Sequence, residues 1–158
     1  MAQTKQKTAG KSTPSKARAM PTQEDYERLA AFRYALRCFM EFSQSAARAA
    51  GLTPQQHQAM LAIKGMPGSA GVTIGDLAGR LLVRHHSAVE LVDRLEQNGL
   101  LRRDSDGQDG RRALLVLTQK GETALLELSA SHLDELSRVG PELSAMLAAF
   151  VPGDDAQA

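Results

Sequence analysis

The chain has 158 residues, 42% of them hydrophobic and 4% aromatic, which is enough for one domain with an ordinary core. It has no run of 18 apolar residues and no apolar N-terminal stretch, which argues against a membrane span and a secretory signal. Its single cysteine excludes an internal disulfide framework, so we expect a cytoplasmic protein. The 19 Lys and Arg nearly balance the 18 Asp and Glu, so any binding of nucleic acid must depend on where the arginines point.

The two ends of the chain are predicted to be tails. Residues 1 to about 20 carry five basic residues and no acid among mostly small polar ones, too little apolar area to offset the entropy of ordering. Two interpretations of this disordered basic tail stay open. It is either an arm that adds non-specific affinity for phosphates or a solvated segment without a role. A second tail is expected at 153–158.

Two long helical regions are predicted to flank the domain. The first, about 22–50, begins with Thr22 and Asp25 in a weak capping-box arrangement and ends at Gly51. It carries five of the six aromatic residues and an apolar stripe that needs a packing partner. We expect that partner to be a second subunit, with helices at about 119–138 and 141–150 completing the dimerisation region; packing within one chain is the alternative. The stripe comprises Leu29, Phe32, Leu36, Phe39, Ser43, Ala46 and Ala50.

Three shorter helices are predicted between the long ones. The first, 53–64, begins with a threonine cap followed by proline, and the second begins at Thr73 after a loop rich in Gly and Pro. The third, 85–97, is ended by an Asn-Gly pair. Its inward positions are apolar and its outward positions are polar. The outward residues are His86, Ser87, Glu90, Asp93, Arg94 and Gln97.

A β-hairpin is predicted after the third short helix. Residues 104–110 are dense in turn formers, the run 113–117 is apolar, and the tip at 109–112 carries two arginines. Helix, turn, helix and charged hairpin in this order are the plan of a winged helix-turn-helix, a fold that reads duplex DNA. We therefore expect a mainly α protein with a small β-hairpin wing, in the α+β class, over residues 21–152.

Five short elements lie in a fixed order along the chain. They are Leu-Thr-Pro-Gln-Gln at 52–56, Asp-Leu-Ala at 76–78, the run 89–101, Asp-x-Arg-Arg at 109–112, and Leu-Thr-Gln-Lys-Gly at 117–121. In order and spacing they resemble the multiple antibiotic resistance regulator (MarR) family over about residues 26–138. The resemblance implies a homodimeric transcriptional regulator that binds double-stranded DNA in the bacterial nucleoid. Most such proteins are repressors released from a pseudo-palindromic operator by a small, often anionic or aromatic, effector.

The resemblance also implies which residues meet DNA. The helix at 85–97 corresponds to the family's recognition helix in the major groove, and Arg111 to the wing-tip arginine that enters the minor groove. Arg112 and Arg84 are implied phosphate contacts, and Asp109 orients its neighbours in the wing. The implied DNA-binding set is Arg84, His86, Ser87, Glu90, Arg94, Arg111 and Arg112.

Two positions depart from the family pattern. Gly110 stands where many relatives have another arginine, which makes the wing tip less basic. Glu90 stands where many have Thr or Ser; its carboxylate can accept from cytosine N4 but is repelled by phosphates. Specificity is therefore expected to depend more on the helix at 85–97 than on the wing.

Other chemistries have weaker support in the sequence. No phosphate loop, nucleophile elbow or carboxylate pair is present, so we expect no enzymatic activity, and the four histidines lack ligand spacing, so we expect no metal or cofactor. Cys38 is expected to be a packed or half-buried thiol, with redox sensing as an alternative function. A winged helix used for protein interaction is another alternative. The implied effector pocket assigns its lining to Arg33, Arg37 and His57.

Overall fold

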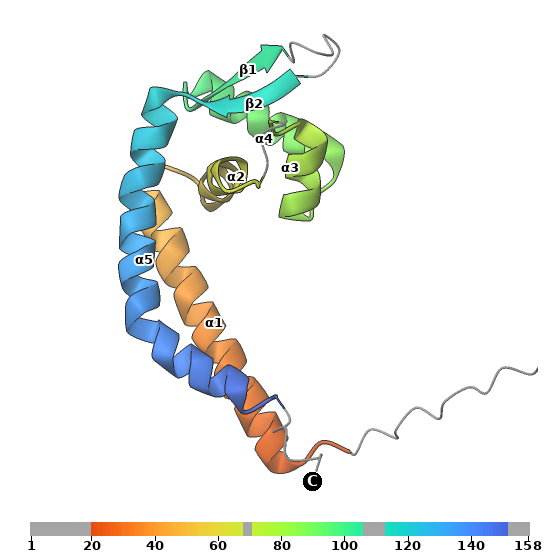
Figure 1. Ribbon diagram of the computed structural model, residues 1–158, viewed down its shortest axis with the longest axis vertical. Coiled ribbons are helices and arrows are strands. Elements are labelled where there is room, and N and C mark those ends of the chain that lie inside the picture. The colour runs from red at the N-terminus through yellow and green to blue at the C-terminus, as the bar shows by residue number, and fades with distance from the viewer. Residues whose placement is uncertain (1–19, 68–70, 106–112, 152–158) are drawn as a thin grey trace, which may run out of the picture.

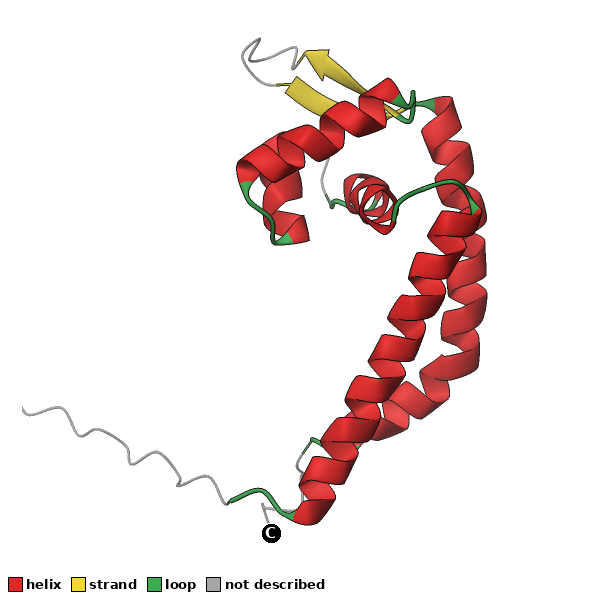
Figure 2. Ribbon diagram, turned by 180° about the vertical axis from the view of Figure 1, so that it is seen from behind, coloured by secondary structure: helices red, strands yellow, loops and turns green. Residues whose placement is uncertain are grey.

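The computed structural model describes residues 20–67, 71–105 and 113–151. Helices α2, α3 and α4 and a two-stranded hairpin form a head, which sits at one end of the antiparallel pair of long helices α1 and α5 (Figure 1). Seen from behind, the hairpin lies at the top of the head beside α4, and its base joins the start of α5 (Figure 2). This arrangement confirms the predicted winged helix-turn-helix. The elements are α1 Gln23–Ala49, α2 Pro54–Lys64, α3 Ile74–Leu81, α4 His85–Gln97, β1 Leu101–Ser105, β2 Ala113–Leu117 and α5 Gln119–Ala148.

Threonine side chains set the starts of the helices. Thr22, Thr53 and Thr73 each cap a helix, and in each case the third residue of the helix returns a side-chain hydrogen bond to the backbone N–H of the threonine. Thr118 caps α5 by accepting a hydrogen bond from the backbone N–H of Gly121. The predicted starts at residues 22, 53 and 73 are confirmed.

The C-terminal region forms one helix, where two were expected. The sequence predicted a break between residues 138 and 141, but α5 continues through Pro141 to Ala148. Proline lacks a backbone N–H and its ring crowds the carbonyl one turn earlier, which bends a helix without necessarily ending it. Figure 1 shows the corresponding bend in the lower half of α5. The expected boundary is therefore wrong, because packing against α1 overrides the helix-breaking tendency of proline.

The hairpin is short and joined to the head by a third segment. β1 and β2 are antiparallel, with Leu101 opposite Leu117 and Ser105 opposite Ala113. The backbone N–H of Leu115 also donates to the carbonyl of Val72 at 2.7 Å, which anchors β2 to the segment before α3. The tip, and with it Asp109, Arg111 and Arg112, lies outside the described residues, as do the two predicted tails.

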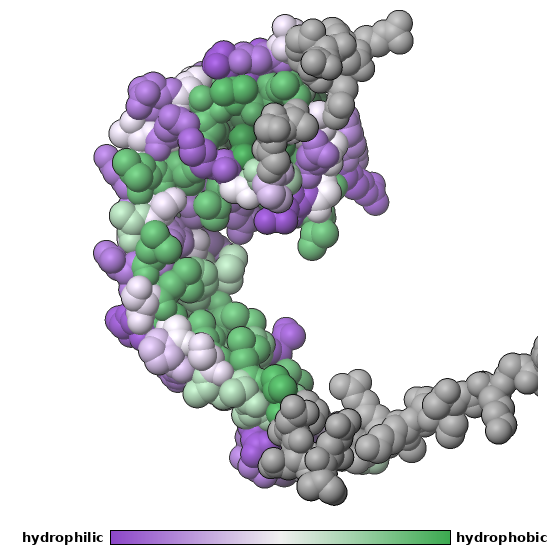
Figure 3. Space-filling model, viewed as in Figure 1, coloured by the Kyte–Doolittle hydropathy of each residue, from purple (hydrophilic) through white to green (hydrophobic). Residues whose placement is uncertain are grey.

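The largest buried side chains lie in the head, whereas several large apolar side chains of the long helices are exposed. The largest fully buried ones are Met60, Leu77, Val92, Leu95 and Leu101. Hydrophobic surface runs along the α1 and α5 pair (Figure 3), where Leu29, Leu36, Leu133 and Leu136 are exposed. Within the described residues, none of the helices is long and apolar enough to cross a membrane.

A glycine allows the first turn of α5 to touch the backbone of the segment before β1. A Cβ added at Gly121 would lie 2.1 Å from the carbonyl oxygen of Leu100, a position that no side chain can occupy without backbone movement. A Cβ at Gly79, inside α3, would meet nothing within 4 Å. The two helical glycines therefore differ sharply in how closely they are packed.

We predict that Gly121→Ala lowers the free energy of unfolding by about 2–3 kcal/mol, because the added methyl overpacks a backbone contact. Gly79→Ala is the matched control and is expected to raise stability by about 0.5–1 kcal/mol, since alanine favours the helix. Urea unfolding monitored by circular dichroism measures both. Equal effects of the two substitutions would contradict the close approach of α5 to Leu100.

Candidate nucleic-acid interface

Helix α4 is positioned by burial of one face. Ala88, Leu91, Val92 and Leu95 are buried in the head core, so the opposite face is turned to solvent. The turn from α3 into α4 includes Leu82, whose φ of 55° is left-handed and whose side chain is 93% exposed. That turn fixes the angle between the two helices of the helix-turn-helix, which determines how α4 is presented.

Three of the residues predicted to meet DNA share one groove. Ser87, Glu90 and Arg94 line a groove of about 320 Å³ between α2 and α4. His86 and Arg84 are exposed at the start of α4 and are not part of that lining. The structure thus brings together the middle of the recognition face.

The same groove contains two residues that the sequence reasoning missed. Gln55 and Gln58 of α2 line it opposite α4. Their spacing of three places both on one face of α2, a signal that was present in the sequence but lacked a partner until the fold was known. Amide side chains are suited to hydrogen bonding with bases or phosphates.

The arginines of the head differ in whether they are neutralised. Within the described residues, Arg80, Arg84 and Arg94 form no ion pair, whereas Arg102 and Arg103 of β1 both pair with carboxylates. The unpaired cations lie on α3, before α4 and on α4. Among the described residues of the head, the positive charge available to an anionic partner therefore lies on α3 and at α4.

Arg103 connects β1 to α4. Its guanidinium donates to the carboxylates of Asp93 and Glu96, and its backbone N–H donates to Glu96 at 3.3 Å. The hydrogen bond to Asp93 and the charge of Glu96 raise the pKa of Arg103. Asp93 was expected simply to face outward; instead, with Glu96, it ties the hairpin to the last turns of α4. Sequence spacing gave no signal for this contact, because it forms across the helix-to-strand turn.

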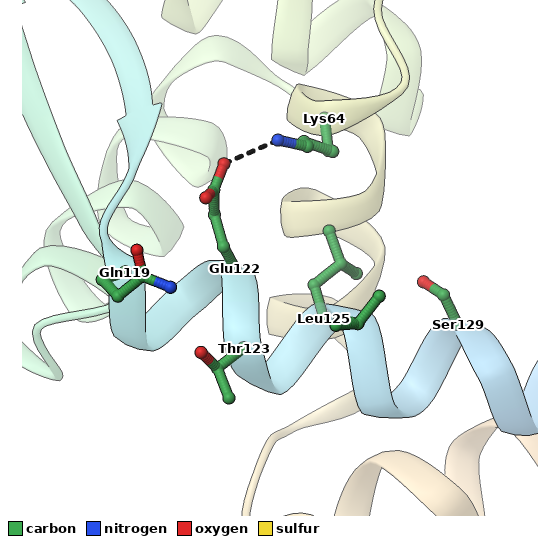
Figure 4. Close-up of a pocket in the computed structure, with 7 residues that line it drawn as sticks. Lys64, Gln119, Glu122, Thr123, Leu125 and Ser129 are labelled. Carbon is green, nitrogen blue, oxygen red and sulfur yellow. Dashed lines mark hydrogen bonds and ion pairs between the residues drawn. The ribbon is translucent and has the colours of Figure 1, made fainter.

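Two contacts connect α2 of the head to α5. Lys64 pairs with Glu122 at 2.6 Å across a second groove of about 320 Å³, which Leu125 and Ser129 also line (Figure 4). Near the other end of α2, His57 is 3% exposed and its ring lies against the ring of His132. The head is thus fastened to α5 at both ends of α2.

The residues predicted to line an effector pocket have unlike surroundings. His57 is buried, whereas Arg33 and Arg37 are exposed on α1, and Arg37 lies over the ring of Tyr34 at 5.9 Å. Their joint role as a pocket stays a prediction.

Cys38 is exposed, so the expectation of a packed or half-buried thiol is wrong. It follows Tyr34 by one helical turn, and a hydrogen bond with Cys38 raises the pKa of Tyr34. In the described part of the chain, no three His, Cys, Asp or Glu side chains are grouped so as to hold a metal ion.

Comparisons with known proteins agree with this fold. Residues 50–112, which span α2 to the hairpin tip, match the model of the MarR family. A MarR family protein from Bacillus stearothermophilus is 24% identical, with a TM-score of 0.66 over 77% of this chain and 82% of that one. No protein with a curated description matches the sequence.

Two further similar structures were solved with a bound molecule. A variant of MepR from S. aureus, bound to an oligodeoxyribonucleotide, is 22% identical with a TM-score of 0.59, over 82% of this chain and 86% of that one. CouR from Rhodococcus jostii, bound to p-coumaroyl-CoA, is 21% identical with a TM-score of 0.60, over 68% of this chain and 74% of that one. At these identities the likeness establishes the fold.

We predict that Arg103→Ala lowers the free energy of unfolding by about 1 kcal/mol and loosens the hairpin, because two carboxylates lose a shared partner. Arg102→Ala is the matched control: it removes the neighbouring, exposed pair with Asp104 and is expected to cost less than about 0.5 kcal/mol. Amide hydrogen exchange in β1 and β2 measures the loosening. Similar exchange rates in both variants would show that Arg103 does not anchor the hairpin.

Proposed function

We propose that this chain, a member of the MarR family of winged-helix regulators, is a homodimeric repressor that works in the cytoplasm on operator DNA and is released by a small effector. The match to the MarR family supports a DNA-binding regulator as the general activity. The dimer, the repressor role and the effector response are our proposals. The oligonucleotide bound to the MepR variant and the p-coumaroyl-CoA bound to CouR support the two classes of partner.

The observation that carries the proposal is the unpaired Arg94 in the groove with Ser87 and Glu90. Arg94 forms no ion pair with a described residue, and such an arginine on the outward face of a recognition helix can donate in a bidentate manner to guanine O6 and N7. Glu90 beside it can accept from cytosine N4, and Ser87 suits a base or a phosphate. This side-chain set favours base readout over a purely electrostatic attachment.

The wing is proposed to supply the second contact. Arg111 is assigned to the minor groove and Arg112 to a phosphate, with Asp109 as the orienting residue. The anchoring of β1 by Arg103 supports this assignment, because it directs the hairpin relative to α4. Arg84 and His86, exposed at the start of α4, are assigned to the backbone beside the major groove.

Homodimerisation is proposed through the long helices. Leu133 is 64% exposed, and Leu29, Leu36 and Leu136 are also open to solvent, so the long helices leave apolar side chains for a partner to cover. A second copy of the chain is the partner that this surface fits, because a two-fold dimer buries the same patch on both subunits. Such a dimer places two recognition helices about one turn of DNA apart.

We predict that Arg94→Ala weakens binding to a selected operator by about 1–3 kcal/mol and relaxes preference at one base pair. Fluorescence anisotropy with the operator and with single-base variants measures both effects. Arg28→Ala, at an exposed arginine near the start of α1 and away from the head, is the control and is expected to bind as wild type does. If Arg94→Ala keeps full affinity and preference, the assignment of α4 as the reading helix is wrong.

The dependence of operator binding on salt concentration tests the alternative function. An affinity for DNA that does not change with salt would favour a protein-interaction module.

We predict that the double substitution Leu36→Asp and Leu133→Asp converts a dimer to a monomer, because charge is placed in the proposed apolar interface. Sedimentation equilibrium measures the mass. Leu61→Asp, at an exposed leucine of α2 in the head, is the matched control and is expected to leave the dimer intact. A monomeric wild type, or dimers in all variants, would contradict this interface.

A further inference from the structure

Three helices meet around two histidines at the junction of the head and the long helices. His57 comes from α2 and His132 from α5, and their ring centroids are 4.7 Å apart with an angle of 35° between the planes. Phe39 and Phe42 of α1 contact the ring of His132 edge to face, with ring centroids 6.2 and 5.7 Å from its centroid. His132 therefore lies between His57 and two aromatic side chains of α1, at the place where α2 rests on α1 and α5.

The hydrogen bonds of His132 indicate which nitrogen carries its proton. Nδ1 lies 2.6 Å from the carbonyl oxygen of Leu128, which can only accept, so Nδ1 is the protonated nitrogen in the neutral ring. Nε2 lies 2.7 Å from Oγ of Ser43 and accepts from its hydroxyl. Ser43 is itself buried, so the α1–α5 contact includes this bond. A second proton on Nε2 would reverse the bond and turn the Ser43 hydroxyl hydrogen away.

No negative charge balances the pair in the part of the chain that the structure describes. On α5, Glu135 pairs with Arg138 at 2.7 Å, and on α1, Glu41 is exposed beside Arg48 at 3.9 Å. On α2, Lys64 is engaged by Glu122 at the opposite end of the helix. Neither histidine forms an ion pair with a described residue. The charged groups on all three helices thus leave the two imidazoles to interact with each other.

The surroundings of His57 favour its neutral form. Burial lowers the pKa of His57 from its ordinary value of 6.5, and the charge of a protonated His132 lowers it further. When folding lowers the pKa of a histidine, the folded state keeps its full stability at pH values above the pKa of the unfolded chain, about 6.5. The free energy of unfolding then decreases as the pH falls through 6.5 toward the pKa of the folded state. Acid therefore acts against the packed junction.

We propose that His57 and His132 form a proton-sensitive junction, in which protonation of the pair separates α2 from α1 and α5 and changes how the head is held. Because α2 lies opposite α4 across the groove of Gln55 and Gln58, a displaced α2 alters the recognition surface. The effect on DNA rests on the proposed function; the coupling of the two histidines does not. Acid is expected to weaken operator binding through this junction.

The first experiment tests the coupling without DNA. The full chain with labelled histidine rings is titrated by NMR, as wild type and as His132→Gln. We expect the pKa of His57 to rise in His132→Gln, because a positive neighbour is removed. Hydrogen exchange at the α2 amides is expected to accelerate in acid for wild type, and less so for His132→Gln. An unchanged pKa of His57, or α2 exchange with the same pH dependence in both proteins, would overturn the proposal.

The second experiment tests the effect on DNA. Operator affinity is measured at about pH 7.5 and at about pH 5.5 for wild type and for His57→Gln. We expect the acid to weaken binding about tenfold more in wild type than in His57→Gln. His85→Gln, at an exposed histidine beside the DNA face, is the matched control and is expected to keep the acid weakening. Protonation of exposed histidines near phosphates acts in the opposite direction, since it adds positive charge. Equal pH profiles for wild type and His57→Gln would overturn the regulatory role.

The two experiments separate this proposal from the proposed function. Absence of operator binding at about pH 7.5, with the histidine coupling intact, would contradict the DNA-binding function and leave the junction supported. Operator binding with no coupling between the histidines would support the DNA-binding function and contradict the junction. If His57→Gln fails to fold, the comparison of wild type with His132→Gln still decides both points.

Discussion

The close contact between the first turn of α5 and the turn that follows α4 is the constraint on which the arrangement of the molecule depends. Gly121 lies against the carbonyl of Leu100, and the Thr118 hydroxyl donates to the carbonyl of Gly99 at 2.6 Å. Lys120 donates to the carbonyl of Asn98 at 2.9 Å. The end of α4, the start of β1 and the start of α5 therefore move together. A change in the direction of α5 is passed directly to the recognition helix.

The attachments of the head to the long helices differ in their physical character. The contact at Gly121 is backbone packing and hydrogen bonding, which changes little with pH or ligands. Those at α2 are a partly exposed ion pair, Lys64 with Glu122, and a histidine pair without a counter-charge. With a firm attachment beside adjustable ones, α2 can shift while the end of α4 stays joined to α5. Such a shift gives a physical route by which an effector or a proton acting at α2 would alter the presentation of α4.

Most of the fold was predictable, and the failures have identifiable causes. Thr22, Thr53 and Thr73 are local signals, since a cap depends on residues within one turn, and all three predicted starts are confirmed. The continuous α5 was missed because proline alone does not reveal the α1 packing that keeps the helix intact. The contacts of Arg103 and His132 were missed because the partners lie on other elements: Glu96 is 7 residues from Arg103, and Ser43 is 89 residues from His132. The sequence identified the outward residues of α4, while the groove with Gln55 and Gln58 required the fold.

The arginines of this nearly neutral chain differ in whether they pair with carboxylates, and this difference decides where positive charge is available. Arg102 and Arg103 serve the hairpin and are neutralised there, so they add little to the field that DNA would experience. Arg84 and Arg94 form no ion pair with a described residue and lie beside the outward face of α4, next to Glu90, whose carboxylate reduces non-specific attraction to phosphates. In the function that we propose, a described surface with few free cations and one carboxylate would attract random DNA weakly, and base contacts of α4 would supply a larger share of the affinity. We propose that α4 then selects the site and that the wing adds direction.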